Sequence, residues 1–149
     1  MRFVPVNTAH LAYLAEHMRE VDRAEVWAAS NALPLDVLHE SVALTDRAEV
    51  MEHRGVPVAV CGVATIPNAP GIGAPWLLGT DEIDRLPVAF NKLCVEWVAR
   101  QRSRWVVLLN YTDARAVKTH HWLEWLGFTL YPPEPYGVEG KPFRRFEMR

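Results

Sequence analysis

The sequence predicts an α+β domain in which a mixed central sheet is flanked by helices. Apolar residues change along the chain between helical and strand spacing, and the clearest helix stands between two apolar strands. Half of the residues are hydrophobic and 23% are charged, a ratio that can fill a core. The length of 149 residues is typical of one domain, so we expect a single domain spanning residues 1–149.

The first expected elements are an edge strand and a helix. Residues 3–6 are predicted as a strand, and Pro5 places it at a sheet edge because proline has no N–H to donate. Asn7 or Thr8 can then cap a helix. Apolar residues at helical spacing carry that helix to about Met18.

Two further helical stretches follow. Residues 19–27 form a highly charged helical segment. Pro34 suits the first position of the next helix, because its φ is already helical and its missing N–H is not needed there. This next helix has an apolar stripe, formed by Leu35, Leu38 and Val42.

The middle of the chain predicts a β-hairpin and a third strand. Residues 48–54 and 56–64 both have strand character, and Arg54-Gly55 makes a turn between them. After a loop rich in proline and glycine, residues 74–79 are predicted as the next strand. An acidic loop, residues 80–84, then leads toward the longest helix.

That longest helix covers residues 86–98, where apolar side chains recur three and four positions apart. Residues 105–109 form a continuous apolar strand, which we expect to be buried on both faces. A strand, a helix and a strand in this order need a right-handed crossover, so we expect two parallel neighbouring strands.

The C-terminal part predicts one more helix and two strands. Asp113 can cap a helix that runs to about Leu126, and Gly127 ends it in the position after the last helical residue. Strands follow at residues 128–131 and 141–148.

Charge and cysteine content exclude several function classes. Sixteen basic and eighteen acidic residues give a net charge of −2, so we expect neither a nucleic-acid nor a membrane partner. Cys61 and Cys94 are too few for a disulfide scaffold and are expected as reduced core thiols in a cytoplasmic protein. His120 and His121 are adjacent, so on a helix they point about 100° apart and cannot share a metal ion. We therefore expect no metal site.

The order of elements and the segment ending in Leu126-Gly127-Phe128 resemble the GCN5-related N-acetyltransferase (GNAT) superfamily. Asn110-Tyr111-Thr112-Asp113 and the helix after it look like the family's last strand–helix unit. Residues 76–80 with helix 86–98 look like its central strand and cofactor-facing helix. The resemblance implies the GNAT-like (acyl-CoA N-acyltransferase) fold, in which the strands at 76–79 and 105–109 part at their ends and leave a slot. It also implies acetyl-CoA as donor and an amine acceptor that attacks the thioester directly in a ternary complex.

A narrower resemblance connects the chain with GNAT-like proteins of tailed bacteriophages, some of them internal virion proteins. It is carried by residues 120–128, by the stretch 18–27 and by Asn110-Tyr111. It implies a phage or prophage protein with a role in the virion or toward the host. Its location would be the bacterial cytoplasm or the virion, and its partner a phage or host protein.

The GNAT resemblance also suggests which residues meet the donor. Backbone N–H groups of Leu77, Leu78 and Gly79 are expected to bind the cofactor, because a bulged strand can present them to an acyl oxygen. Arg85 and Asn110 complete the expected cofactor-binding set. Arg85 would offset part of the charge of a pyrophosphate.

Two departures from the family's pattern count against an active enzyme. The phosphate-binding loop usually contains spaced glycines, whereas residues 79–86 contain one glycine and three carboxylates. Asp81 and Asp84 are interpreted as caps of the helix that follows. Leu123 occupies the position where the family often has a proton-donating tyrosine. Two hypotheses therefore stay open: a GNAT-fold protein with a degenerate acetyl-CoA site, and an active N-acetyltransferase.

If the protein is an enzyme, the charged helix 19–27 lies over the cleft. Glu25 is then the candidate general base and Tyr111 the candidate proton donor. Tyr131 and Tyr136 are more distant candidate donors, and the alternative for both is packing against the proline-rich turn. Asp22 and Trp27 are expected to form a wall on the substrate side. The alternative is a solvated helix face on which these charges form exposed ion pairs of little energetic value.

Overall fold

The computed structural model describes all 149 residues, and its centre is one seven-stranded mixed sheet with the order β1-β2-β3-β4-β5-β7-β6. The strands are β1 (Arg2–Pro5), β2 (Glu49–His53), β3 (Val56–Thr65), β4 (Ile72–Gly79), β5 (Val107–Asp113), β6 (Thr129–Tyr136) and β7 (Lys141–Met148). The helices are α1 (Thr8–Glu16), α2 (Glu20–Ser30), α3 (Pro34–Ala43), α4 (Glu82–Arg85), α5 (Pro87–Arg102) and α6 (Val117–Leu126).

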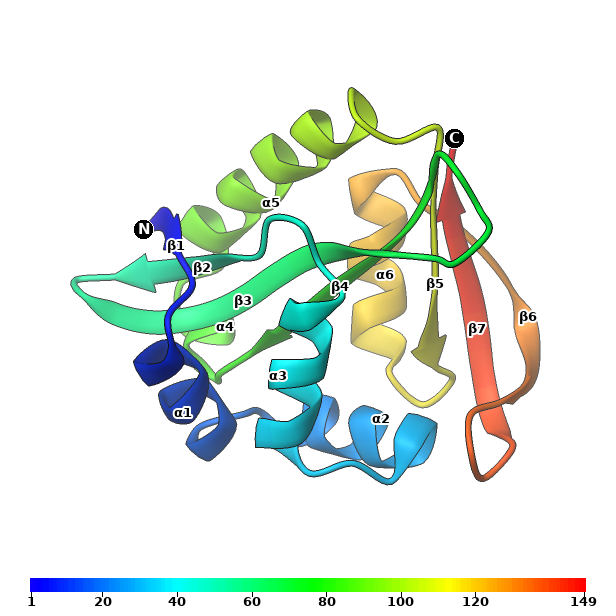
Figure 1. Ribbon diagram of the computed structural model, residues 1–149, viewed down its shortest axis with the longest axis horizontal. Coiled ribbons are helices and arrows are strands. Elements are labelled where there is room, and N and C mark those ends of the chain that lie inside the picture. The colour runs from blue at the N-terminus through cyan, green and yellow to red at the C-terminus, as the bar shows by residue number, and fades with distance from the viewer.

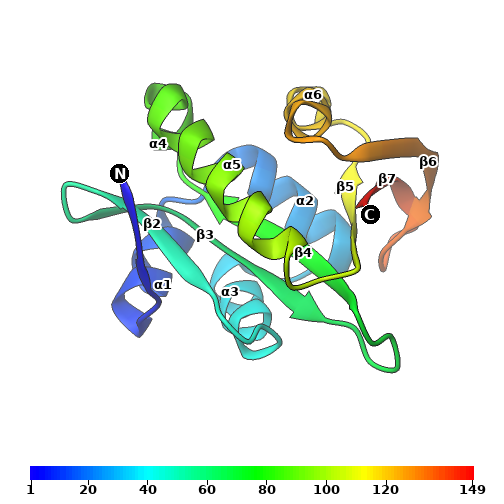
Figure 2. The ribbon, with the colours of Figure 1, turned by 90° about the horizontal axis from the view of Figure 1, so that it is seen from above.

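Helices cover both faces of the sheet. Seen from above, α5 and α6 lie on one side, and α1 and α3 lie on the other (Figure 2). Each side has its own apolar core: Phe90, Trp97 and Leu123 belong to the larger one, and Leu14 and Leu38 to the smaller one. The predicted α+β class with a mixed sheet between helices is confirmed. None of the helices is both long and apolar enough to cross a membrane.

Strands β4 and β5 are the only parallel neighbours, and they separate soon after they start. They pair only at Ile72 with Val107 and at Gly73 with Leu108. Figure 1 shows the two strands running downward and apart from this shared beginning. On their outer sides β4 stays paired with β3 and β5 with β7. The predicted slot between parting parallel strands is confirmed, and it opens within the sheet.

Several local predictions in the N-terminal half are confirmed. Strand β1 forms one edge of the sheet, as expected from Pro5. The side chain of Asn7 accepts a hydrogen bond from the N–H of His10 and caps α1, although the helix ends at Glu16 rather than near Met18. Strands β2 and β3 form the predicted hairpin. Both turn residues, Arg54 and Gly55, have positive φ, as a tight hairpin turn requires.

Around β5 the sequence prediction was wrong in its boundaries. The strand begins at Val107, two residues later than expected, and the side chain of Val106 is 73% exposed. It continues through Asp113, which therefore does not cap α6. Ala116 stands before α6, and the Asp113 carboxylate instead accepts hydrogen bonds from the backbone and side chain of Arg115. The prediction followed apolar content and therefore placed the strand too early. The second half of the real strand is polar because it faces the slot.

The C-terminal hairpin is longer than predicted and closes against α2. Strand β6 runs on through its prolines to Tyr136 at the second edge of the sheet. The turn after it meets the end of α2, where the N–H of Val138 donates to the Ala29 carbonyl at 3.0 Å. Gly137 has φ +76, and an added Cβ would lie 2.7 Å from the Ala29 oxygen. The approach is so close that only glycine fits.

This contact predicts a difference between the two glycines of the turn. Gly137→Ala should lower the free energy of unfolding by about 2–3 kcal/mol, because positive φ and a backbone clash act together. Gly140→Ala is the control: its φ is +63, but nothing lies within 4 Å of the added Cβ. It should cost about 1 kcal/mol. Urea unfolding measures both values, and equal losses would contradict the close approach.

Candidate active site in the gap between strands β4 and β5

Asn110 stands at the point where β4 and β5 part. Its side-chain amide donates to the Pro75 carbonyl on β4 at 2.9 Å, and its amide oxygen accepts from the Tyr111 N–H at 2.8 Å. Both backbone groups lie on strand edges that no longer face each other closely enough to pair. Asn110 therefore satisfies the first backbone groups of the gap and keeps the strands apart.

Past Asn110, where β5 continues through Tyr111 and Thr112, the gap is a cavity of about 230 Å³ with a mostly apolar lining. Its walls come from β4, β5, α2, α5 and α6. The N–H of Thr80 donates to Val58 on β3, so the N–H and C=O of Gly79 point away from β3. Because strand residues alternate, the N–H and C=O of Leu77 point the same way, into the gap. Leu77 thus presents a backbone N–H to the cavity. The expected bulge is absent, because β4 pairs with β3 in unbroken register, and the N–H of Leu78 therefore faces β3 rather than the cavity.

Glu25 reaches this cavity from α2 and sits on the open edge of β5. Its Oε1 accepts from the Asp113 N–H at 2.6 Å and from the Thr112 hydroxyl at 3.0 Å. Burial raises the pKa of Glu25 from its ordinary 4.5 to about 7; the two hydrogen bonds oppose the shift and the charge of Asp22 adds to it. A carboxyl with this pKa can exchange a proton near neutral pH.

Two tyrosines lie beside Glu25. Tyr111 of β5 and Tyr136 of β6 both line the cavity, and their rings stack with centroids 4.2 Å apart. Burial raises the pKa of both hydroxyls, and Glu134 adds to the shift at Tyr111. Both phenols are therefore protonated at neutral pH and can donate a proton. Of the two more distant candidate donors, Tyr136 lines the cavity, whereas Tyr131 lies outside it and donates its hydroxyl to Glu147.

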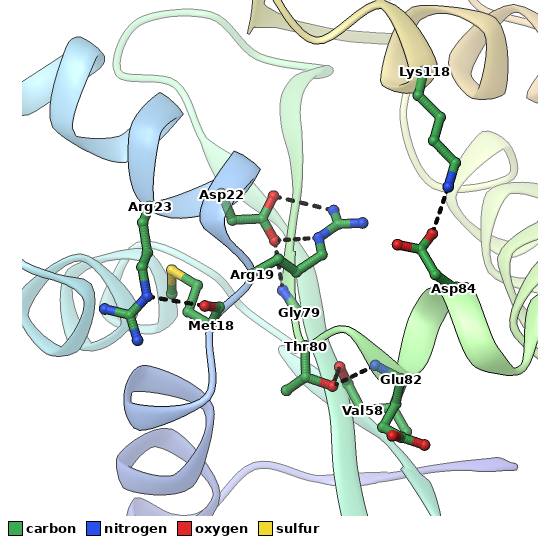
Figure 3. Close-up of polar contacts among 10 residues, drawn as sticks. All are labelled: Met18, Arg19, Asp22, Arg23, Val58, Gly79, Thr80, Glu82, Asp84 and Lys118. Carbon is green, nitrogen blue, oxygen red and sulfur yellow. Dashed lines mark hydrogen bonds and ion pairs between the residues drawn. The ribbon is translucent and has the colours of Figure 1, made fainter.

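The corner between α1 and α2 closes the end of β4 (Figure 3). Asp22 accepts a hydrogen bond from the Gly79 N–H at 2.9 Å, and the N–H of Arg19 donates to the Gly79 carbonyl at 2.9 Å. The Arg19 guanidinium holds the Asp22 carboxylate with two hydrogen bonds of 2.9 and 3.1 Å. Arg23 anchors the corner by donating to three carbonyl groups at the end of α1.

The alternative of exposed ion pairs on this helix is therefore wrong for Arg19 and Asp22. Asp22 is buried, and its partner Arg19 is largely buried as well. The i,i+3 spacing fits a surface pair equally well, so the sequence did not distinguish the two arrangements.

The connection from β4 to α5 is folded back on the strand as the short helix α4. Ile83 packs so close to Gly79 that an added Cβ on the glycine would lie 2.4 Å from Ile83 Cδ1. The predicted caps are wrong: α5 starts at Pro87 without a side-chain cap, and neither Asp81 nor Asp84 provides one. Asp84 instead forms an ion pair of 2.7 Å with Lys118 (Figure 3).

The structure brings most of the predicted site residues together. Those that line the cavity are Asp22, Glu25, Leu77, Leu78, Asn110 and Tyr111. Gly79 adjoins it, with its N–H taken by Asp22. Trp27 and Arg85 do not line it: Trp27 is 50% exposed, and Arg85 pairs with Glu82 at the surface. Leu123 lines the α6 wall and has no proton to give.

No protein-family model matches the sequence, and no curated protein matches it. Solved structures do match in fold. The ribosomal-protein-alanine N-acetyltransferase of Brucella melitensis superposes with a TM-score of 0.76 at 14% identity, covering 99% of each chain. The spermidine N-acetyltransferase of Vibrio cholerae, solved with CoA and spermine, gives 0.71 at 12% identity and covers 99% of this chain and 94% of its own.

A GNAT superfamily phosphinothricin acetyltransferase from Sinorhizobium meliloti, solved with acetyl-CoA, gives a TM-score of 0.72 at 13% identity. The match covers 99% of this chain and 86% of that one. The chain therefore has the GNAT acetyltransferase fold, as the sequence resemblance implied. These three structures come from bacteria, and none of their names mentions a phage or a virion.

The bridge made by Asn110 can be tested by its removal. Asn110→Ala leaves the Pro75 carbonyl and the Tyr111 N–H without partners, which should cost about 1–3 kcal/mol of unfolding free energy. The Tyr111 N–H should then exchange faster with solvent. Asn91→Ala is the control, because it removes the side-chain hydrogen bond that joins α5 to Trp122 of α6 and leaves the edges of β4 and β5 unchanged. Unchanged exchange at Tyr111 in Asn110→Ala would contradict the bridge.

The raised pKa of Glu25 predicts a pH-dependent loss of stability. In the unfolded chain Glu25 ionises near pH 4.5, but in the folded protein only near 7. The folded state binds more protons between these values, so stability falls as pH rises through this window. Relative to Glu25→Gln, the unfolding free energy should fall by up to about 3 kcal/mol. Urea unfolding across this range checks it, and a pH-independent difference would refute the shift.

Proposed function

We propose that the protein is an N-acetyltransferase that accepts the acetyl thioester end of its donor in the cavity between β4 and β5. The observation that carries this proposal is Glu25, a carboxyl with a pKa of about 7 on the open strand edge of that cavity. A general base works best when its pKa is near the working pH. The fold and the acetyl-CoA or CoA found in two of the similar structures support the same donor class.

The donor acetyl-CoA supplies an activated acetyl thioester. The amine nitrogen attacks the thioester carbon, and the carbonyl oxygen gains negative charge, which the Leu77 N–H is placed to stabilise. Glu25 takes the proton that the amine loses. The carbon–sulfur bond then breaks, and the thiolate leaves and takes a proton, for which the Tyr111 hydroxyl is the candidate donor in this chain. The products are an acetamide and a free thiol.

Direct transfer is favoured over an acetyl-cysteine intermediate. Cys61 and Cys94 both line the cavity, so a thiol nucleophile is available in principle. Burial raises the pKa of Cys94 to about 12, and it also raises the pKa of Cys61. Neither thiol is ionised at neutral pH, and only the thiolate is a strong nucleophile.

A second candidate function is a GNAT-fold protein with a degenerate donor site. The acidic α4 segment and Leu123 favour it, because neither feature helps to bind a pyrophosphate or to protonate a thiolate. A phage or prophage origin, with a role in the virion or toward a host protein, belongs to this candidate. That finer assignment rests on the sequence resemblance alone.

The enzyme proposal predicts a specific loss in Glu25→Gln. Thiol release from acetyl-CoA should be measured with a panel of primary amines that includes a polyamine and a peptide with a free N-terminus. Glu25→Gln should lower kcat/KM by about 10²- to 10⁴-fold. The wild-type rate should rise with pH through about 7, and the variant should lack this rise. Tyr111→Phe should lower kcat while donor binding stays unchanged.

The control for this experiment is Glu20→Gln, an exposed carboxylate on the same helix that does not line the cavity. It should leave the rate and the pH profile as in the wild type. A donor at about 100 times its Kd should also stabilise the fold by about 2.7 kcal/mol. If millimolar acetyl-CoA neither stabilises the protein nor releases thiol with any amine, the enzyme proposal fails and the second candidate stands.

A further inference from the structure

We infer that this chain recognises its acetyl donor through the acyl-pantetheine arm alone, so that a pantetheine thioester without a nucleotide serves it as well as acetyl-CoA. The inference rests on the proposed function and concerns the donor class of the same site. It follows from a contrast between the two ends of the gap. The inner end can hold a neutral arm, whereas the connection from β4 to α5 lacks what a pyrophosphate needs.

The inner end suits a neutral, amide-containing arm. The cavity walls are mostly apolar, and Leu77 offers an N–H and a C=O on a strand edge that pairs with no other strand. An extended chain that carries amides can hydrogen-bond to such an edge as an additional strand would. Pantetheine contains two amides and no charge, so this part of the donor fits the gap.

The connection between β4 and α5 has few N–H groups left for a phosphate. A pyrophosphate is normally held by free backbone N–H groups at a loop and a helix N-terminus. Here the Gly79 N–H is bonded to Asp22, and those of Thr80, Glu82, Ile83, Asp84 and Leu86 are bonded within the connection or to β3. Pro87, the first residue of α5, has no N–H at all, so the first turn of this uncapped helix leaves only the N–H groups of Val88 and Ala89 for a phosphate.

The negative charge of the connection between β4 and α5 also disfavours phosphate binding. Residues 81–85 carry three carboxylates and one guanidinium, and Arg85 is engaged by Glu82. Two cations beside the connection are committed as well: Lys118 pairs with Asp84, and Arg19 lies between Asp22 and Asp84 (Figure 3). The negative phosphates of CoA would meet repulsion here, and more of it at low salt.

Three donors separate the contributions of the arm and of the nucleotide: acetyl-CoA, S-acetyl-4′-phosphopantetheine and S-acetylpantetheine. Binding is measured by calorimetry and by thermal shift, and transfer by kcat/KM with a single amine. We expect S-acetylpantetheine to match acetyl-CoA within about tenfold in both. Raising the ionic strength should improve acetyl-CoA binding and leave S-acetylpantetheine unchanged. A preference for acetyl-CoA of more than about tenfold overturns the inference.

A charge-neutralising variant tests the cause. The triple change Asp81→Asn, Glu82→Gln and Asp84→Asn should raise the preference for acetyl-CoA over S-acetylpantetheine by about tenfold or more. The control is Asp36→Asn, Glu40→Gln and Glu96→Gln, three exposed carboxylates elsewhere that change the net charge equally. It should not alter the preference, and an equal rise in both variants would overturn the local repulsion. If no thioester binds at all, the proposed function fails instead.

Discussion

The separation of two parallel strands in the middle of the sheet governs the rest of this structure. Each strand loses its partner on one side, so backbone N–H and C=O groups inside the protein need other partners. Asn110 satisfies the first of them, Glu25 binds the Asp113 N–H, and Asp22 binds the Gly79 N–H. The carboxylates that look catalytic are thus also structural partners of unpaired strand edges. Leu77 is the position at which the edge stays available.

The same constraint explains why the carboxylates at the two strand edges of the gap, Glu25 at β5 and Asp22 at β4, differ in chemistry. At β5, Glu25 is held among apolar walls and near Asp22, and its charged form is disfavoured. At the end of β4, Asp22 is paired with Arg19 and fully engaged by Gly79. The carboxyl group of Glu25 is therefore available for proton exchange, whereas that of Asp22 has a purely structural role. Their spacing of three residues on α2 places them at opposite edges of one opening.

Periodicity alone identified most helices and strands, and the family resemblance identified the parting of β4 and β5. Helix spacing could not show which face of α2 turns inward, so the sequence left Glu25 open between a base and a solvated charge. Trp27 lies on the outer face of the same helix, and the residue type alone could not show on which face it would lie. Tyr131 and Tyr136 were equally distant candidates in the sequence, and only the pairing of β6 with β7, which no local pattern encodes, brings Tyr136 to the site. Asp81 looked like a cap because it precedes a helix, but the chain inserts α4 there.

The prolines of β6 have a consequence for how copies of this protein can associate. Strand β6 ends the sheet, and Pro132, Pro133 and Pro135 remove three amide hydrogens from it. An exposed strand normally invites another chain to extend the ladder, and a strand with so few donors cannot support that growth. Self-association by sheet continuation is therefore blocked at this margin, and the short β1 at the far margin, which ends in Pro5, offers little more.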